Sequence, residues 1–455
     1  MPATAGIANK TTWTRLLVAV LAGAVVWGAA AWVFPGTQAI LTGLIAFLVI
    51  LWTNEGLPLG AVSLLPLILF PAFGIADMQA VAANYANPII FLFLGGFMLA
   101  IAVEATGLHQ QIAFRLLAIF PNTARGMIFA LALVAGLLSA FLSNTTTALL
   151  LMPLAMFLTD EPRLNVRFAL AIAYGASVGG VATPIGTPPN LILLGFMEQH
   201  AIEPWAFVQW IGLVLPLEIA MFIAVGMLLS FGVSETRLSR PASAEKLNPG
   251  QRRVAYTLGG LLLLLLVNSP IQPFYAGLGL DERAILLAFG LSMLLPGVGV
   301  LNWTDCRKIP YEIIFLFGAG FSIAHAFGAT GLSQAIGDLL LALTTLDLWL
   351  LIVIVALLVT FTTEITSNTA LISMILPVVH SVSSSGALNS TLFMLVATIC
   401  ASYAFMLPIA TPPNAIAIAS GTVRPLTMMR FGLLLNLTGI ALISLFALGY
   451  WRFVL

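Results

Sequence analysis

Two short polar motifs occur twice in this otherwise apolar chain. Ser143-Asn144-Thr145 is followed by Thr187-Pro188-Pro189-Asn190, and Ser367-Asn368-Thr369 is followed by Thr411-Pro412-Pro413-Asn414. Both copies keep one spacing (367 − 143 = 411 − 187 = 224). Ser and Thr hydroxyls and Asn amides offer neutral oxygens to a hard cation and donors to an anion. A polar, helix-breaking signature repeated in two halves of an apolar chain predicts a substrate and ion site of a secondary transporter.

The proline pairs predict that the backbone opens beside these motifs. Two successive prolines remove backbone donors, so a helix cannot continue through Thr187 or Thr411. Carbonyls near Gly186 and Ala410 would then be free for a cation, while helix amino termini would favour a carboxylate. A single such motif would more simply be a kink. Because both motifs are paired, we expect two cation sites and one substrate pocket between them.

Composition places the motifs in a membrane. Hydrophobic residues make up 60% of the 455 positions and charged residues 7%, against roughly 25% charged residues in soluble domains. The equal numbers of basic and acidic residues argue against a nucleic-acid partner. We predict eleven crossings, at 16–34, 38–53, 57–74, 88–105, 166–196, 207–231, 254–274, 283–301, 312–329, 391–420 and 431–450.

Two further apolar stretches, 127–158 and 350–383, are each interrupted by Ser-Asn-Thr. An unbroken span needs about 20 apolar residues, so each half is too short to cross, and each stretch is predicted to be a re-entrant hairpin. The predicted fold is an all-α polytopic membrane protein with eleven transmembrane helices and two re-entrant hairpins.

Basic residues predict the orientation of the two halves. Lys10 and Arg15 place the amino terminus in the cytoplasm, and the carboxyl terminus then lies outside. Several arginines flank the first hairpin, whereas no Lys or Arg occurs from 309 to 423, around the second. The first hairpin is therefore expected on the cytoplasmic side and the second on the outer side, which describes an inverted repeat.

Polar groups outside the repeated motifs are harder to assign to a site. Glu364 lies three residues before the second Ser-Asn-Thr, and its repeat partner is Ala140. It could be a gate or site-shaping group, or a residue of the outer mouth. The chain holds no His-Glu-x-x-His, Gly-x-Ser-Gly or Gly-x-Gly-Asp motif, so we do not predict an enzyme. An ion channel remains an alternative, since pores also use backbone carbonyls.

The paired motifs, with the internal repeat over essentially the whole chain, resemble the divalent anion/sodium symporter family of INDY-type and solute carrier family 13-type carboxylate transporters. The resemblance implies a homodimer with an elevator-type mechanism, in which a mobile part carries substrate past a fixed scaffold. It implies scaffold at 1–126 and 254–349, transport parts at 127–232 and 350–455, and a cytoplasmic connection at 233–253.

The resemblance also implies ligands. The first sodium site resembles a set of Ser139, Ser143, Asn144 and the Gly186 carbonyl, and the second a set of Thr363, Thr366, Asn368 and the Ala410 carbonyl. Substrate carboxylates would meet Asn144, Thr145, Asn368 and Thr369, with Thr411 and Pro412 beside them and Thr187 and Pro188 as symmetric counterparts.

These residues lead to one expected function. It is sodium-coupled import of a C4 dicarboxylate (succinate, malate or fumarate) across the inner (plasma) membrane, with sodium co-transported and no organic cofactor. Exchange of dicarboxylates, or transport of citrate or sulfate, remains open.

Overall fold

The structure is a computed structural model, and it describes residues 3–54, 56–156, 158–236, 238, 246–270, 274–339, 346–386 and 388–455. The described residues form helices and no β-strand, as an apolar chain in lipid must satisfy its backbone groups within each segment. The described part of the predicted connection at 233–253 is limited to 233–236, 238 and 246–253.

In chain order, the first half contains α1 (Ala3–Ala30), α2 (Gly36–Asn54), α3 (Leu59–Leu64), α4 (Pro66–Ala72), α5 (Met78–Asn84), α6 (Pro88–Thr106), α7 (Leu108–Leu117), α8 (Ala124–Ser139), α9 (Asn144–Met156), α10 (Pro162–Gly179), α11 (Pro188–Gln199) and α12 (Phe207–Ser230). The second half contains α13 (Pro249–Asn268), α14 (Glu282–Ser292), η1 (Trp303–Lys308), α15 (Tyr311–Ala329), α16 (Leu332–Leu339), α17 (Leu348–Thr363), α18 (Asn368–Ser385), α19 (Ser390–Ser402), α20 (Pro412–Ala419), α21 (Pro425–Phe446), η3 (Ala447–Trp451) and α22 (Arg452–Val454).

Six helices among the described residues are long and apolar enough to cross a membrane: Thr12–Ala30, Gly36–Asn54, Met78–Thr106, Phe207–Ser230, Tyr311–Ala329 and Pro425–Val454. They coincide with six of the eleven predicted crossings. The other five ranges contain helices that are broken, shorter or less apolar. The range 57–74, for example, was predicted as one helix but forms α3 and α4, because Pro66 starts a new helix there.

The two halves break at equivalent residues. Helices α8 and α17 begin and end 224 positions apart, and so do the beginnings of α9 and α18 and of α11 and α20. Between α8 and α9 the chain turns at residues 140–143, and between α17 and α18 at 364–367. The helix breaks predicted at the Thr-Pro-Pro-Asn motifs are present, at 180–187 and 403–411.

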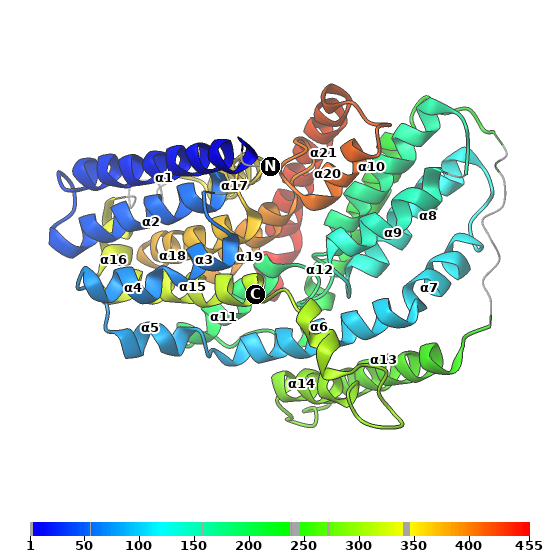
Figure 1. Cartoon of the computed structure of the whole chain (residues 1–455), viewed down its shortest axis with the longest axis horizontal. Helices are drawn as coiled ribbons and strands as arrows, with labels where there is room; N and C mark the ends of the chain where they lie inside the picture. The colour runs from blue at the N-terminus through cyan, green and yellow to red at the C-terminus, as the bar shows by residue number, and fades with distance from the viewer. Residues whose placement is uncertain are drawn as a thin grey trace.

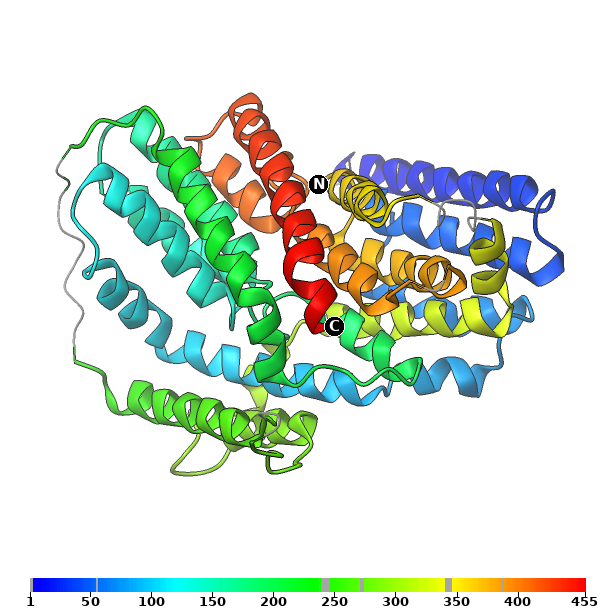
Figure 2. The same ribbon diagram turned by 180° about the vertical axis from the view of Figure 1, so that it is seen from behind.

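The helices form a long, layered body. Helices α1 and α2 run side by side at one end, and α8, α9 and α10 lie at the other (Figure 1). Behind them, α12 and α21 cross the body next to each other (Figure 2). Helices α13 and α14 pack on α6 and form one edge of the molecule (Figure 1).

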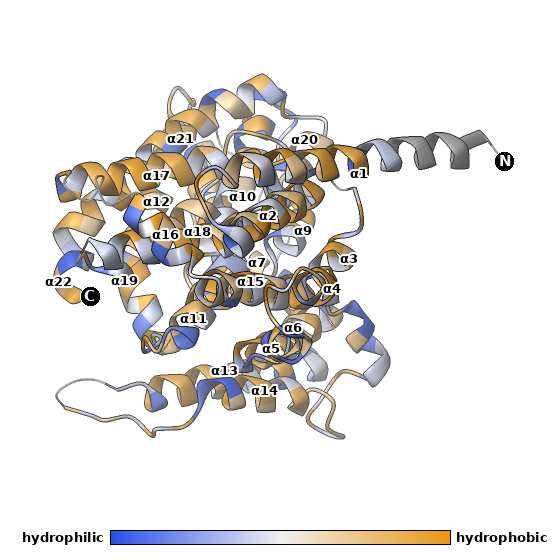
Figure 3. Ribbon diagram, turned by 90° about the vertical axis from the view of Figure 1, so that its left-hand side faces the viewer, coloured by the Kyte–Doolittle hydropathy of each residue, from blue (hydrophilic) through white to orange (hydrophobic). Residues whose placement is uncertain are grey.

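The outer surface of the helices is apolar. Hydrophobic residues cover most of the long helices, and hydrophilic ones gather near helix ends and connections (Figure 3). Large apolar side chains such as Val25, Met227 and Leu263 are more than 60% exposed. Such extended apolar surface is costly in water and suits contact with lipid. The chain is therefore a polytopic helical membrane protein.

Candidate functional site

One cavity of about 340 Å³ lies between the two Ser-Asn-Thr turns and the two Thr-Pro-Pro-Asn breaks. This volume falls within the range of small-molecule sites, roughly 300–1,000 Å³. All eight residues predicted to contact substrate line it: Thr187, Pro188, Asn144, Thr145, Asn368, Thr369, Thr411 and Pro412. The fold thus brings together side chains that are up to 268 positions apart in the sequence (412 − 144).

The opposite wall of the cavity is apolar. Phe93 and Phe97 of α6 and Leu316 of α15 form part of this wall, together with Leu59 at the start of α3. Among the described residues that line the cavity, none is charged and none is a histidine. An anion that enters would therefore have to be balanced by dipoles and by co-bound cations.

Four helix amino termini meet at this cavity. Helices α9 and α18 begin at Asn144 and Asn368, and α11 and α20 begin at Pro188 and Pro412. Each amino terminus carries partial positive charge, and the first turn of each helix leaves N–H groups without intrahelical acceptors. Because proline lacks an N–H, α9 and α18 supply more of these donors than α11 and α20.

In the first half, the predicted cation ligands Ser139 and Asn144 are in direct contact. The Ser139 hydroxyl donates to Asn144 Oδ1 at 2.5 Å. Gly180 and Gly186 of the α10–α11 break close around them: a Cβ on Gly180 would lie 2.8 Å from Asn144 Oδ1, and one on Gly186 would lie 3.1 Å from the Ser139 carbonyl oxygen. The Ser143 hydroxyl instead caps α9, since it accepts from the Thr146 N–H at 3.1 Å.

The second half repeats this geometry. The Thr363 hydroxyl contacts Asn368 Oδ1 at 2.6 Å and the Ala401 carbonyl oxygen at 2.7 Å. The Thr366 hydroxyl, in the turn after α17, donates to the Thr362 carbonyl of that helix at 2.8 Å, and Ala410 lines the cavity. Each half therefore gathers a hydroxyl, an amide oxygen and backbone carbonyls, which are the neutral oxygen ligands that a hard monovalent cation prefers.

The last residue of each Thr-Pro-Pro-Asn motif holds the break open. Asn190 Nδ2 donates to the carbonyls of Thr183 at 2.8 Å, Gly180 at 3.2 Å and Val181 at 3.4 Å. Asn414 Nδ2 donates to the carbonyls of Leu407 at 3.0 Å and Ala404 at 3.1 Å. Sequence reasoning gave these two asparagines no role, although their fixed place in a repeated motif was a usable signal.

Each turn between hairpin helices is tied to the neighbouring break. In the first half, the Thr183 hydroxyl donates to the Ala140 carbonyl. In the second, Glu364 is 3% exposed and accepts from the N–H groups of Met406 at 2.9 Å and Leu407 at 2.8 Å. Glu364 also accepts from Asn436 Nδ2 at 2.7 Å. Of the two roles left open for Glu364, its burial and contacts favour shaping of the site over a place at the outer mouth.

A second buried carboxylate was missed by the sequence reasoning. Glu218, inside α12, is 1% exposed and accepts from the Tyr403 hydroxyl at 2.7 Å. Tyr403 follows the last residue of α19 and is the first residue of the second break. The signal was available, because a carboxylate within an apolar crossing is a functional candidate by default.

Comparisons with known proteins agree with this geometry. The family model described as "Citrate transporter" matches residues 47–398. The sodium-dependent dicarboxylate transporter SdcS of Staphylococcus saprophyticus is 29% identical, with 87% of this chain and 82% of that protein covered. Solute carrier family 13 member 2 of Homo sapiens is 28% identical (92% and 89% covered), and an uncharacterized transporter of Haemophilus influenzae is 31% identical (90% and 91% covered).

A solved structure supports the fold. The crystal structure of the YdaH transporter of Alcanivorax borkumensis superposes with a TM-score of 0.63 at 16% identity, covering 92% of this chain and 99% of that one. With the paired motifs at one cavity and the relatives above, this chain is a membrane transporter and not an enzyme. It belongs to the citrate-transporter family, within the divalent anion/sodium symporters of the INDY and solute carrier family 13 type.

Proposed function

We propose that this transporter imports C4 dicarboxylates, such as succinate, malate or fumarate, by symport with sodium. The observation that carries the proposal is the cavity shared by both Ser-Asn-Thr turns and both Thr-Pro-Pro-Asn breaks, with no charged side chain among its described lining residues. The printed names of the Staphylococcus relatives, sodium-dependent dicarboxylate transporters, support it.

Charge explains why sodium would be required. A dianion in a cavity lined without Lys or Arg would be poorly compensated at low dielectric. Sodium ions bound beside it would offset its charge and order the two turns. By linkage, the anion then tightens sodium binding by the same factor. If more sodium ions than the two charges of the anion are carried, the membrane potential also drives uptake.

The residues of the cavity would have two roles, binding of the substrate carboxylates and shaping of the pocket. One substrate carboxylate would bind at Asn144 and Thr145 and the other at Asn368 and Thr369, each at the start of a helix. Thr411 strengthens this assignment, because its Oγ1 is buried and has no hydrogen-bond partner among the described residues. Its counterpart Thr187, with Pro188 and Pro412, would shape the pocket.

The sodium sites would use the two oxygen clusters. Ser139, Asn144 and the Gly186 carbonyl would hold one ion, and Thr363, Asn368 and the Ala410 carbonyl the other. The Ser143 hydroxyl caps α9 and the Thr366 hydroxyl binds the Thr362 carbonyl near the end of α17, so each would have to rotate to join its site.

We further propose the eleven-crossing inverted repeat, with the amino terminus in the cytoplasm and the carboxyl terminus outside. The scaffold part would contain α1 to α7 and α13 to α16, and the transport part α8 to α12 and α17 to α22. Since α8 begins at Ala124 and α17 at Leu348, the transport part would start there rather than at 127 and 350. A homodimer with elevator-like movement of the transport part would complete the mechanism.

Uptake by proteoliposomes tests the proposal. Labelled succinate should accumulate in an inward sodium gradient, and Asn144→Ala and Asn368→Ala should each abolish this uptake. Asn389→Ala is a matched control, because Asn389 caps α19 and does not line the cavity. Uptake like that of the unmodified protein in both cavity variants would contradict the assignment.

The second candidate keeps the fold and changes the cargo or the coupling. The matching family model is described as a citrate transporter, which favours a tricarboxylate or a related anion as the alternative. A competition panel of di- and tricarboxylates and sulfate against labelled succinate, in sodium, lithium and potassium, separates the cargoes. Uptake driven by internal succinate without sodium would indicate exchange. Saturable flux with counterflow would indicate a carrier, and ohmic single-channel currents would indicate a channel.

A further inference from the structure

The boundary between α6, α13 and α14 on one side and α8, α11 and α12 on the other is loosely packed. A cavity of about 500 Å³ lies along it, walled by apolar side chains such as Leu261 of α13 and Leu138 of α8. A second cavity of about 500 Å³ lies where α14 begins, and Glu198, Phe207 and Arg283 line it. Voids of this size remove packing contacts, so few contacts between apolar side chains hold the two sides together there.

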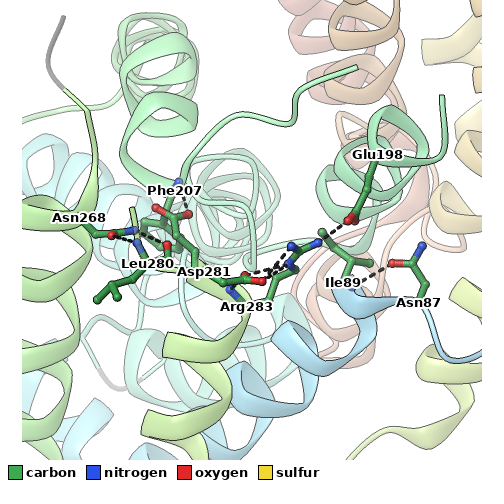
Figure 4. A network of polar contacts seen from close by, with 9 residues as sticks. Asn87, Ile89, Glu198, Phe207, Asn268, Leu280, Asp281 and Arg283 are labelled. Atoms are coloured by element: carbon green, nitrogen blue, oxygen red, sulfur yellow. Dashed lines mark hydrogen bonds and ion pairs between the residues drawn. The ribbon is translucent and has the colours of Figure 1, made fainter. Parts of the chain in front are cut away.

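Polar contacts cross this boundary at the start of α14. Arg283 of α14 forms an ion pair with Glu198 near the end of α11. Its neighbour Glu282 accepts from the Phe207 N–H, at the beginning of α12, at 2.7 Å. Figure 4 shows these contacts, which reach from the α14 side to Glu198 of α11 and Phe207 of α12.

The α14 side of these contacts is positioned in advance. Asp281 caps α14 and holds the Arg283 guanidinium, with Nε to Oδ1 at 2.8 Å and Nη2 to Oδ2 at 2.9 Å. Asn268, at the end of α13, fixes the preceding loop by bonds to the N–H and carbonyl of Leu280 at 2.8 and 2.9 Å (Figure 4). Asp281 thus keeps the Arg283 guanidinium in place whether or not Glu198 is within contact distance.

The two glutamates at this boundary each use only one carboxylate oxygen in a hydrogen bond or ion pair. Glu198 Oε2 and Glu282 Oε1 are buried and have no hydrogen-bond partner among the described residues. The side chains of Arg283 and Glu198 are each 32% exposed, so water and salt screen their attraction. A contact of this kind holds two surfaces together but can be released at modest cost.

We propose that Glu198, Glu282 and Arg283 form a releasable latch between the scaffold and transport parts. The latch stabilises the arrangement seen in the structure and controls how often the transport part leaves it. The inference rests on the proposed function, because it needs the division into fixed and mobile parts. Glu198 and Arg283 act through the position of the transport part and do not touch the cargo.

Substitutions on the two sides of the boundary test the latch. Glu198→Gln and Arg283→Gln remove the ion pair that crosses it, whereas the control Asp77→Asn changes a carboxylate that caps α5 away from this boundary. Reaction of an Ala100→Cys variant, in the wall of the substrate cavity, with a water-soluble maleimide in proteoliposomes reports the arrangement and needs no transport. The latch variants should change the labelling rate by about two- to fivefold, the value of a partly screened ion pair, and high salt should reduce the difference.

Conservative replacement of the arginine gives a second arm. Arg283→Lys keeps a positive charge opposite Glu198 and should label closer to the parent than Arg283→Gln does, while Glu198→Arg, which places like charges across the boundary, should not. If Glu198→Gln and Arg283→Gln label like Asp77→Asn at low and high salt, the latch is refuted. If the latch variants shift labelling but no dicarboxylate is transported by the parent, the latch stands and the proposed cargo fails.

Discussion

The two proposed sodium sites are built from similar residues but are supported differently. In both halves a hydroxyl meets the motif asparagine, at 2.5 Å from Ser139 to Asn144 and at 2.6 Å from Thr363 to Asn368. The residues that support them differ. Thr183, a neutral hydroxyl, ties the first turn to its break, whereas Glu364 ties the second through two hydrogen bonds to the break and binds Asn436 of α21 by a third.

The comparison shows which features the repeat has kept. Ala140 and Glu364 occupy equivalent positions, and so do Thr183 and Leu407. In the first half the turn accepts and the break donates from a side chain; in the second half the break donates from its backbone to a side chain of the turn. The same two positions are joined by different chemistry, so the requirement is a fixed turn and not a particular residue.

The largest effect should come from the carboxylate that supports the second site. Glu364→Ala would leave the N–H groups of Met406 and Leu407 and the Asn436 amide without an acceptor in a buried place. Bonds to a charged group contribute about 1.5–3 kcal/mol each, so we expect loss of sodium-dependent uptake and a clearly lower thermal midpoint in detergent. Glu104→Gln, at an exposed position of α6, should change neither.

The next largest effect should come from the last asparagine of each Thr-Pro-Pro-Asn motif. Asn190→Ala would remove hydrogen bonds to three backbone carbonyls and Asn414→Ala to two. Each variant should lose about 2 kcal/mol of stability, at about 1 kcal/mol for each hydrogen bond removed, and Asn190→Ala should lose more. Thermal unfolding with and without sodium measures this, and equal or reversed losses would mean that the bonds to Asn190 are not the stronger set.

Removal of the hydroxyl that contacts Asn144 or Asn368 should weaken sodium binding in the corresponding half. We expect Ser139→Ala and Thr363→Ala each to raise the half-saturating sodium concentration by about fivefold, equivalent to about 1 kcal/mol. Thr363→Ala should have the larger effect, because Thr363 also contacts the Ala401 carbonyl. Thr363→Ser keeps the hydroxyl and should behave like the parent; a loss as large as that of Thr363→Ala would assign the effect to packing.

The smallest effect should come from the neutral Thr183 hydroxyl, which joins the first turn to its break. Thr183→Val preserves shape and removes the bond to the Ala140 carbonyl, at a cost of about 1 kcal/mol for a neutral hydrogen bond. Uptake should persist with a slightly lower thermal midpoint. A loss equal to that of Glu364→Ala would show that the two supports are equivalent after all.

The sequence predicted the cavity residues better than their supports. Repetition located Asn144 and Asn368, and proline chemistry located both breaks, because each depends on local sequence. The roles of Asn190, Asn414 and Glu218 depend on which backbone carbonyls and hydroxyls the fold leaves free nearby, which a sequence does not state. The range 391–420 was predicted as one broken crossing and does form α19 and α20, but only the structure shows that Asn414 holds the break.

The four helix amino termini at the cavity have an electrical consequence. They attract anions through dipoles, and the described residues that line the cavity add no fixed charge. An empty cavity would then cross the bilayer with no fixed charge in its lining, so during the return half of a transport cycle voltage would act only on charged groups behind the lining, such as Glu364. The step that carries cargo adds the charges of the anion and of the sodium ions, so the number of sodium ions could be read from the difference in voltage dependence between the two steps.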